Sequence, residues 1–143
     1  MSAPKPPPDQ YSADQNPYKH NRGLTRAWHA AKNSLSGIRF AIHEESAFRQ
    51  ELTLCLILLP CAFVVPATVV ERILMLGTLV LVLIVELLNS SVEAAVDRIS
   101  LEHHGLSKRA KDFGSAAVML ALILCGGTWA AVAGPWLWHL WRT

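Results

Sequence analysis

A row of polar side chains interrupts the longest apolar stretch of the sequence. Glu86, Asn89, Glu93 and Asp97 follow one another at intervals of three or four residues. On a helix, such intervals place side chains on one side, within about a third of the circumference. An ionisable side chain inside a membrane span costs about 2.5 kcal/mol or more and marks a functional site by default. We therefore interpret this acidic stripe as the working site of the protein.

Three kinds of chemistry are open to the acidic stripe. Its acids could pair with basic residues and only hold a helix bundle together, but the middles of the apolar runs contain no basic residues. They could line a pathway for protons or cations, although three spans leave little room for one without oligomerisation. They could also bind a metal ion and phosphate, because Mg²⁺ usually takes one or two carboxylates together with substrate phosphates.

Basic residues beyond the acidic stripe favour the metal and phosphate interpretation. Lys108, Arg109 and Lys111 follow it closely in the sequence and could position phosphate groups. Glu45 precedes the first apolar run and can approach from the same side. The tripeptide 112–114 spells the magnesium motif of protein kinases, but the chain lacks their Gly-rich loop and catalytic-loop pattern. A Walker-type phosphate loop is also missing from the sequence.

The composition indicates that the elements carrying the stripe span a membrane. The chain has 143 residues, of which 52% are hydrophobic and only 17% charged, and the apolar residues are gathered into long runs. Cys55, Cys61 and Cys125 lie in these runs and are interpreted as small hydrophobic residues rather than a disulfide framework or a zinc site. The net charge of +2, with scattered basic residues, argues against nucleic acid as a partner.

The expected fold class is an all-α membrane protein with an amino-terminal amphipathic helix and three transmembrane helices. Residues 24–43 alternate apolar and basic positions at helical spacing, which predicts a helix lying in the membrane interface. Spans are expected at about 48–65, 73–99 and 112–133, joined by a short connection at 67–72 and a charged loop at 100–111. The proline-rich residues 1–22 are expected to form a disordered tail, and residues 23–143 one membrane domain.

Two further features concern the last span and the orientation. Small residues at 114–117 open this span and permit close contact with another helix, and the tryptophan-rich residues 135–141 predict an aromatic anchor at the membrane interface. Most Lys and Arg residues lie in the amino-terminal arm and in the segment 100–111, whereas the connection at 67–72 has only Arg72. The positive-inside rule therefore predicts a cytoplasmic amino terminus and a carboxyl terminus on the opposite side.

Three blocks of the sequence resemble the prokaryotic diacylglycerol kinases. They are ELLNSSVEAAVDR at residues 86–98, ESAFRQE at 45–51 and AKDFGSAA at 110–117. Their order and separation also agree with that family, and the resemblance covers about residues 23–133. It implies an ATP-dependent enzyme that phosphorylates the free hydroxyl of membrane diacylglycerol to give phosphatidic acid, with Mg²⁺. It further implies a homotrimer in the bacterial inner membrane, with sites at the cytoplasmic face.

The resemblance also implies roles for single residues. Glu86 falls on the position of the general base, and Glu45 and Glu93 fall on those of magnesium ligands. The positions that contact ATP fall on Arg26, Glu45, Glu93, Glu102, His104, Lys111 and Asp112. Those near the lipid substrate fall on Arg26, Ser34, Phe48, Gln50, Glu51, Glu86 and Ser115. Asn89 is a further polar site residue, as is Asp97, for which a helix-end salt bridge with Arg98 or Lys108 is an alternative.

Two other functions stay open at this point. The same chemistry on undecaprenol is the first, since some members of the family favour that lipid. The second is a small oligomeric cation or drug transporter that uses the acidic stripe as its ion site. A cation pathway should not be lined by Lys108, Arg109 and Lys111, whereas a site for nucleotide phosphates should.

Overall fold

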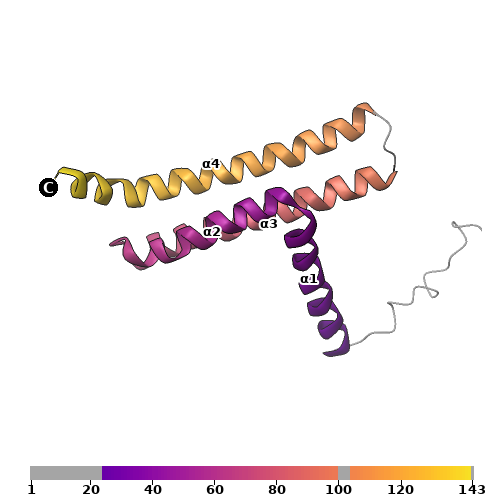
Figure 1. Cartoon of the computed structure of the whole chain (residues 1–143), viewed down its shortest axis with the longest axis horizontal. Coiled ribbons are helices and arrows are strands. Elements are labelled where there is room, and N and C mark those ends of the chain that lie inside the picture. The colour runs from indigo at the N-terminus through magenta and orange to yellow at the C-terminus, as the bar shows by residue number, and fades with distance from the viewer. Residues whose placement is uncertain (1–23, 100–103, 143) are drawn as a thin grey trace, which may run out of the picture. The chain divides into compact units, whose positions relative to one another are not determined.

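The computed structural model describes residues 24–99 and 104–142, which form four α-helices (Figure 1). They are α1 (Leu24–Glu44), α2 (Ser46–Val64), α3 (Val69–Ile99) and α4 (Gly105–Arg142), and the described residues contain no strand. The chain divides into two compact units, one ending at Arg39 within α1 and the other beginning at Phe40. The expected tail at residues 1–22 and the predicted site residue Glu102 lie outside the described residues.

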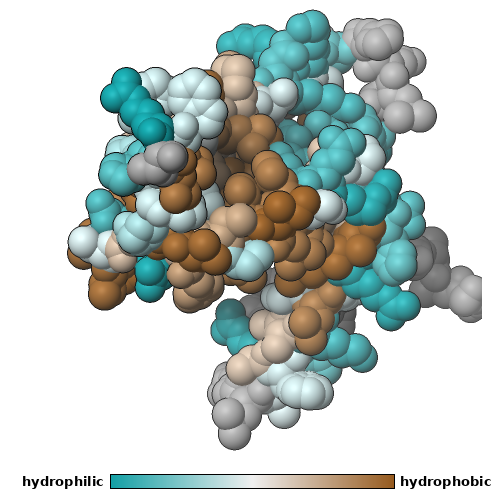
Figure 2. Space-filling model, turned by 60° about the vertical axis from the view of Figure 1, so that its left-hand side comes forward, coloured by the Kyte–Doolittle hydropathy of each residue, from teal (hydrophilic) through white to brown (hydrophobic). Residues whose placement is uncertain are grey.

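Helices α2, α3 and α4 are each long and apolar enough to cross a membrane. Most of their large apolar side chains face outward; Leu56 is 60% exposed, Ile73 63% and Leu120 63%. Figure 2 shows brown, hydrophobic side chains gathered over the middle of the face turned toward the viewer, with teal, hydrophilic side chains around them. An outward apolar surface of this kind is what a lipid environment accommodates, because helices satisfy their own backbone hydrogen bonds. The predicted all-α fold class with three apolar helices after an amino-terminal helix is therefore confirmed.

Helix α1 is amphipathic along its own length. Trp28 and Leu35 are 71% and 69% exposed, and polar and basic residues separate them in the sequence. The Ser34 hydroxyl donates a hydrogen bond to the carbonyl of Ala30, at 3.0 Å, and so stays on its own helix. A helix with exposed apolar and basic faces suits a membrane interface, and that location stays a prediction.

A capping box and an arginine close the turn between α2 and α3. Thr68 donates its backbone N–H (2.7 Å) and its hydroxyl (2.6 Å) to the Glu71 carboxylate, and the Glu71 N–H donates back to the Thr68 hydroxyl at 3.3 Å. Arg72 donates to the carbonyls of Ala62 at 3.1 Å and Ala67 at 3.4 Å. These bonds provide hydrogen-bond partners for backbone N–H groups at the start of α3 and for a backbone carbonyl in the last turn of α2, which have no partner within their own helix. They explain why α3 begins at Val69, four residues earlier than the expected span.

The core of the bundle lies where α2 and α4 pack on α3. One cluster of buried residues contains Cys55, Leu79, Val82, Ala121 and Cys125, and a second contains Ala62, Val65, Met75 and Ala133. Met75 is fully buried, and its carbonyl accepts hydrogen bonds from Trp129 Nε1 at 3.2 Å and from the Thr78 hydroxyl at 3.0 Å. This packing fixes the register of α4 against α3.

Helix α4 is longer than the expected span at both ends. Part of the segment expected as a loop, from Gly105 onward, is helical. His104 Nδ1 accepts the N–H of Leu106 at 3.2 Å, and Lys108 pairs with Asp112 one turn later at 2.6 Å, so local side-chain bonds support this first turn. At the other end α4 continues through Pro135 to Arg142, where the Arg142 guanidinium lies over the Trp138 ring, 4.6 Å from its centroid.

Candidate functional site

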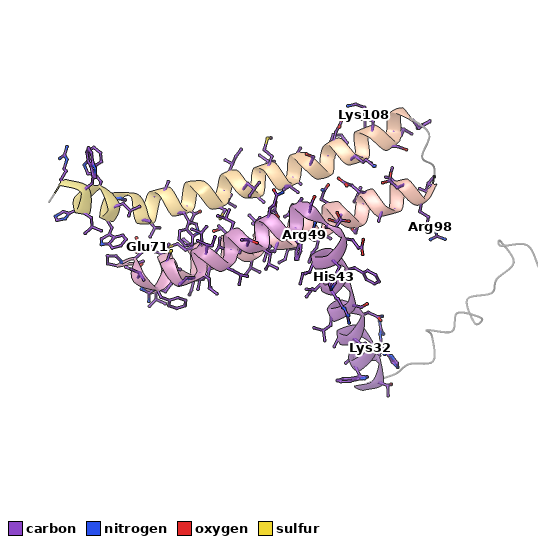
Figure 3. The ribbon with its side chains drawn as sticks, in the orientation of Figure 1. Lys32, His43, Arg49, Glu71, Arg98 and Lys108 are labelled. Carbon is purple, nitrogen blue, oxygen red and sulfur yellow. The ribbon has the colours of Figure 1, made fainter. Side chains whose placement is uncertain are left out.

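The acidic stripe occupies the half of α3 that runs toward α4 in the sequence. Helices α3 and α4 lie side by side and antiparallel, with α2 along the opposite half of α3 (Figure 1). Arg98 and Lys108 lie at the end where α3 leads into α4, and Glu71 lies at the other end of the helix pair (Figure 3). The acidic stripe therefore belongs to the end of α3 that lies near Arg98 and Lys108.

Glu86 is the most deeply placed acid of the stripe. Its side chain is only 3% exposed, and among the described residues it is the one buried charged residue. The carboxylates of Glu93 and Glu45 act on it electrostatically, and Glu51 on α2 does the same. No described cation forms an ion pair with it. A buried carboxylate kept among other carboxylates is a poor device for holding a bundle together, and its presence points to chemistry.

Asn89 stands one helical turn from Glu86 and one from Glu93. Its amide Nδ2 donates to Glu93 Oε1 at 3.3 Å. Its other end, Oδ1, is buried and accepts no conventional hydrogen bond. Asn89 therefore holds the Glu93 carboxylate by its amide nitrogen, and its role as a polar site residue stays a prediction.

Two ion pairs join the basic residues of α4 to acids at this end. Lys111 Nζ lies 2.6 Å from Asp97 Oδ1, across the α3–α4 interface, and Lys108 Nζ lies 2.6 Å from Asp112 Oδ2 within α4. A salt bridge of Asp97 was the alternative that the sequence left open, but the partner is Lys111 rather than Arg98 or Lys108. Both pairs are partly exposed, so each contributes about 0–1 kcal/mol to stability. Their main effect is to fix where the ammonium groups point.

Helix α2 contributes a second acid face. Glu45 is the N-cap residue of α2, with an extended backbone, and its carboxylate makes no capping hydrogen bond. Phe48 is 3% exposed and packs inward, whereas Gln50 is exposed. Glu51 is half-buried, and its Oε2 is buried without a hydrogen-bond partner. We call Glu45, Glu51, Glu86 and Glu93 the carboxylate cluster.

The remaining predicted site residues lie outside this cluster. His104 is exposed just before α4 and Ser115 is exposed on α4. The Nδ1 atom of His104 accepts a hydrogen bond from the backbone N–H of Leu106. Arg26 and Ser34 are exposed on the part of α1 that belongs to the other unit. The roles predicted for these four residues, and for Glu102 outside the described residues, stay predictions.

The carboxylate cluster fits a phosphate-bound magnesium ion better than a protein-enclosed metal. Within residues 24–99 and 104–142, no three His, Cys, Asp or Glu side chains are arranged to hold a metal ion. Mg²⁺ does not need such a cage, because it usually keeps water and binds one or two carboxylates plus substrate phosphates. Glu93 and Glu45 offer hard oxygen donors of this kind, so the donor set fits the ion.

Sequence patterns did not reveal two contacts of this site. One is the Lys111–Asp97 pair, and the other is the close approach of Gly114 on α4 to Asn89 on α3. The small residues at 114–117 signalled a close helix contact, but they did not indicate which residue of α3 would meet them. That depends on the register of two helices, which a single sequence does not contain.

Comparison with known proteins supports the resemblance of the three blocks. The family model for prokaryotic diacylglycerol kinase matches residues 32–133. A diacylglycerol kinase of Pseudomonas aeruginosa is 49% identical over 117 residues, which cover 82% of this chain and 95% of the relative. That of Escherichia coli K12 is 47% identical over 107 residues, covering 75% and 88%. One from Helicobacter pylori 26695 is 38% identical over 116 residues, covering 81% and 88%.

The match extends from the second half of α1 through most of α4, so it includes the carboxylate cluster, the acidic stripe and the three apolar helices. Residues 134–142 of α4 lie beyond it. The predictions of an enzyme, of a kinase that uses a nucleotide and of a membrane protein of a prokaryotic family are confirmed at this level. With the identity to its relatives spread over most of its length, this chain belongs to the prokaryotic diacylglycerol kinase family.

Proposed function

We propose that this chain transfers the γ-phosphoryl group of ATP to the free hydroxyl of a membrane diacylglycerol. The bond between the γ-phosphorus and the bridging oxygen of ATP breaks, the lipid oxygen bonds to that phosphorus, and ADP and phosphatidic acid leave. The observation that carries this proposal is Glu86, a buried carboxylate without a cationic partner beside Glu93, in a member of this kinase family. Phosphoryl transfer asks for positioning, charge neutralisation and a group that accepts the hydroxyl proton.

Glu86 is proposed as the general base that accepts this proton. It lies 17 residues after Val69, which is about 26 Å along the helix at 1.5 Å per residue. If the hydrocarbon core of about 30 Å begins at the first turn of α3, Glu86 lies just inside its far boundary. A diacylglycerol hydroxyl lies at the same depth, near the headgroups. The depth of Glu86 therefore suits a lipid hydroxyl better than a water-soluble acceptor.

Glu93 and Glu45 are proposed to hold Mg²⁺ together with the phosphates of ATP. The ion, when bound, neutralises charge that develops on the phosphate oxygens. Asn89 holds one oxygen of Glu93 and leaves the remaining lone pairs free for a ligand. Lys111, fixed by Asp97, is proposed to contact the nucleotide, as are Arg26, Glu102, His104 and Asp112.

The lipid substrate is proposed to approach along α2. Phe48 and Glu51 face the bundle, and the unpartnered Oε2 of Glu51 can accept a hydrogen bond from a lipid hydroxyl or glycerol backbone. Gln50 is exposed on the same helix and Ser115 on α4. Arg26 and Ser34 of α1 complete the proposed lipid contacts.

We also propose that the protein works as a homotrimer in the bacterial inner membrane. The exposed apolar side chains of α2, α3 and α4 leave ample surface for contact with other copies and with lipid. Arg98 and Lys108 lie at the end of the helix pair where α3 leads into α4 (Figure 3), and Arg109 and Lys111 follow in the first turns of α4, which supports a cytoplasmic location for that end. The amino terminus is then cytoplasmic and the carboxyl terminus periplasmic.

A direct assay tests the proposed activity. Purified protein in mixed micelles receives ATP labelled at the γ-phosphate, Mg²⁺ and either diacylglycerol or undecaprenol. We expect labelled phosphatidic acid, with little label on undecaprenol. If only undecaprenol became labelled, undecaprenol rather than diacylglycerol would be the acceptor. If no labelled lipid formed in either mixture, the kinase proposal would be overturned.

A further inference from the structure

Gly114 is the point at which α4 comes closest to the acidic stripe. A Cβ built on this glycine would collide with Asn89 Oδ1 and lie 3.3 Å from Asn89 Cγ. The other described glycines, which include Gly126 and Gly127 on the same helix, have nothing within 4 Å of such an atom. The space that a side chain at residue 114 would fill is therefore occupied by one specific neighbour, the Asn89 amide.

The same contact accounts for the buried oxygen of Asn89. Oδ1 is buried and accepts no conventional hydrogen bond. The direction in which a Cβ would extend from Gly114 is the direction of one of its Cα hydrogens, so this hydrogen points at Oδ1. Contacts between a Cα hydrogen and an oxygen recur where helices approach closely. The oxygen end of the amide is thus held against α4, and its NH₂ end faces Glu93, with 3.3 Å between Nδ2 and Oε1.

We propose that Gly114 is a positioning residue that fixes the orientation of the Asn89 amide, and through it the Glu93 carboxylate. The reversed amide would present Oδ1 to Glu93, which would place two acceptors against each other. A side chain at residue 114 would push the amide out of the interface and remove its hydrogen bond to Glu93. The kinetic consequence of losing this hydrogen bond rests on the proposed function, in which Glu93 binds Mg²⁺. The orientation itself does not.

The kinetic test compares Gly114→Ala with Gly126→Ala, a change on the same helix where a methyl group meets open space. Partners that orient a metal ligand typically cost 10–100-fold in metal affinity when they are lost. We therefore expect Gly114→Ala to raise the Mg²⁺ concentration for half-maximal activity by about 10- to 100-fold, with kcat at saturating Mg²⁺ and the KM for diacylglycerol changed much less. Gly126→Ala should leave all three unchanged. Equal effects of the two variants, or a loss confined to kcat, would overturn the proposal.

A double-mutant cycle asks whether Gly114 acts through Asn89. Asn89→Ala removes the amide and makes room for a methyl group at residue 114. Adding Gly114→Ala to Asn89→Ala should then change neither the Mg²⁺ requirement nor the melting temperature, because coupled sites are not additive. Full additivity would show that Gly114 acts on general helix packing. If Gly114→Ala alone fails to fold, the double variant should fold; failure of both would also overturn the proposal.

A spectroscopic test needs no substrate. The chain contains four asparagines, Asn16, Asn21, Asn33 and Asn89, so protein labelled with ¹⁵N only at asparagine gives few side-chain amide signals. The Asn89 pair is the one missing from Asn89→Ala. Gly114→Ala should shift or broaden this pair, and Gly126→Ala should not. An unchanged Asn89 signal in Gly114→Ala would contradict the proposal even if the wild-type protein is an active kinase, and a shifted signal would support it even if no lipid is phosphorylated.

Discussion

The two halves of α3 use polar side chains in opposite ways. In the half near the α2–α3 turn, Thr68 and Glu71 hydrogen-bond to each other. Arg72 donates to carbonyls at the end of α2 and in the turn, and Trp129 donates to the Met75 carbonyl. In the half that carries the acidic stripe, Glu86 is buried without a cationic partner among the described residues, and Oε2 of Glu51, on the neighbouring helix α2, is buried without a hydrogen-bond partner. Satisfied groups indicate a role in stability, and unsatisfied groups indicate a site that waits for a ligand.

The largest expected effect concerns the stripe half. Glu86→Gln keeps the shape of the side chain but removes the group that accepts the proton, so we expect kcat to fall by about 10²- to 10⁴-fold. The melting temperature should stay the same or rise, because a buried charge has been removed. Glu71→Gln, the matched change at the other end of α3, should leave kcat unaltered. A clear loss of stability in Glu86→Gln would mean that this carboxylate holds the bundle together.

The turn half should show the reverse behaviour. Met75 is fully buried between the helices, and Met75→Ala leaves a cavity, which we expect to cost about 2–5 kcal/mol of unfolding free energy. The measurement is reversible unfolding in a detergent and denaturant mixture, with kcat determined per folded molecule. The kcat per folded molecule should remain close to that of the wild-type protein. A large fall in kcat of the folded fraction would break the separation of the two halves.

A smaller effect is expected at the start of α3. Thr68→Ala removes the hydroxyl of the capping box and should lower the unfolding free energy by about 1 kcal/mol. Thr128→Ala is a suitable control on α4, because that hydroxyl bonds only within its own helix, to Leu124 at 2.8 Å. Similar stability losses for both variants would show that the capping box has no special weight.

The sequence predicted features within single helices better than contacts between helices. The apolar runs located the three long helices, and the intervals from Glu86 to Asp97 were sufficient to place the acids on one side of α3. The span was expected from residue 73, but α3 begins at Val69. The Thr68-x-x-Glu71 pattern of a capping box is present in the sequence and would have indicated this earlier start. Pairings between helices were not predictable in this way, because Asn89–Gly114 and Asp97–Lys111 depend on the register that packing of Met75 and Trp129 sets.

The smallest expected effect concerns Lys111. Asp97→Asn removes its anchoring charge, which for a partly exposed pair is about 0.2–1 kcal/mol. If Lys111 contacts ATP, the KM for ATP should rise by about two- to fivefold, with kcat little changed. Glu71→Gln removes a carboxylate charge at the other end of α3, where it bonds to Thr68, and should leave that KM unchanged. A KM unaffected by Asp97→Asn would mean that the pair does not position Lys111 for the nucleotide.

The most direct test of Glu86 as the base separates binding from chemistry. Labelled Mg-ATP is titrated into Glu86→Gln in mixed micelles that contain diacylglycerol, and bound nucleotide and labelled lipid are measured in the same samples. We predict nucleotide binding with a Kd close to that of the wild-type protein and almost no labelled phosphatidic acid. Loss of nucleotide binding together with transfer would contradict this account, because Glu86 would then be a ligand or a structural residue rather than the proton acceptor.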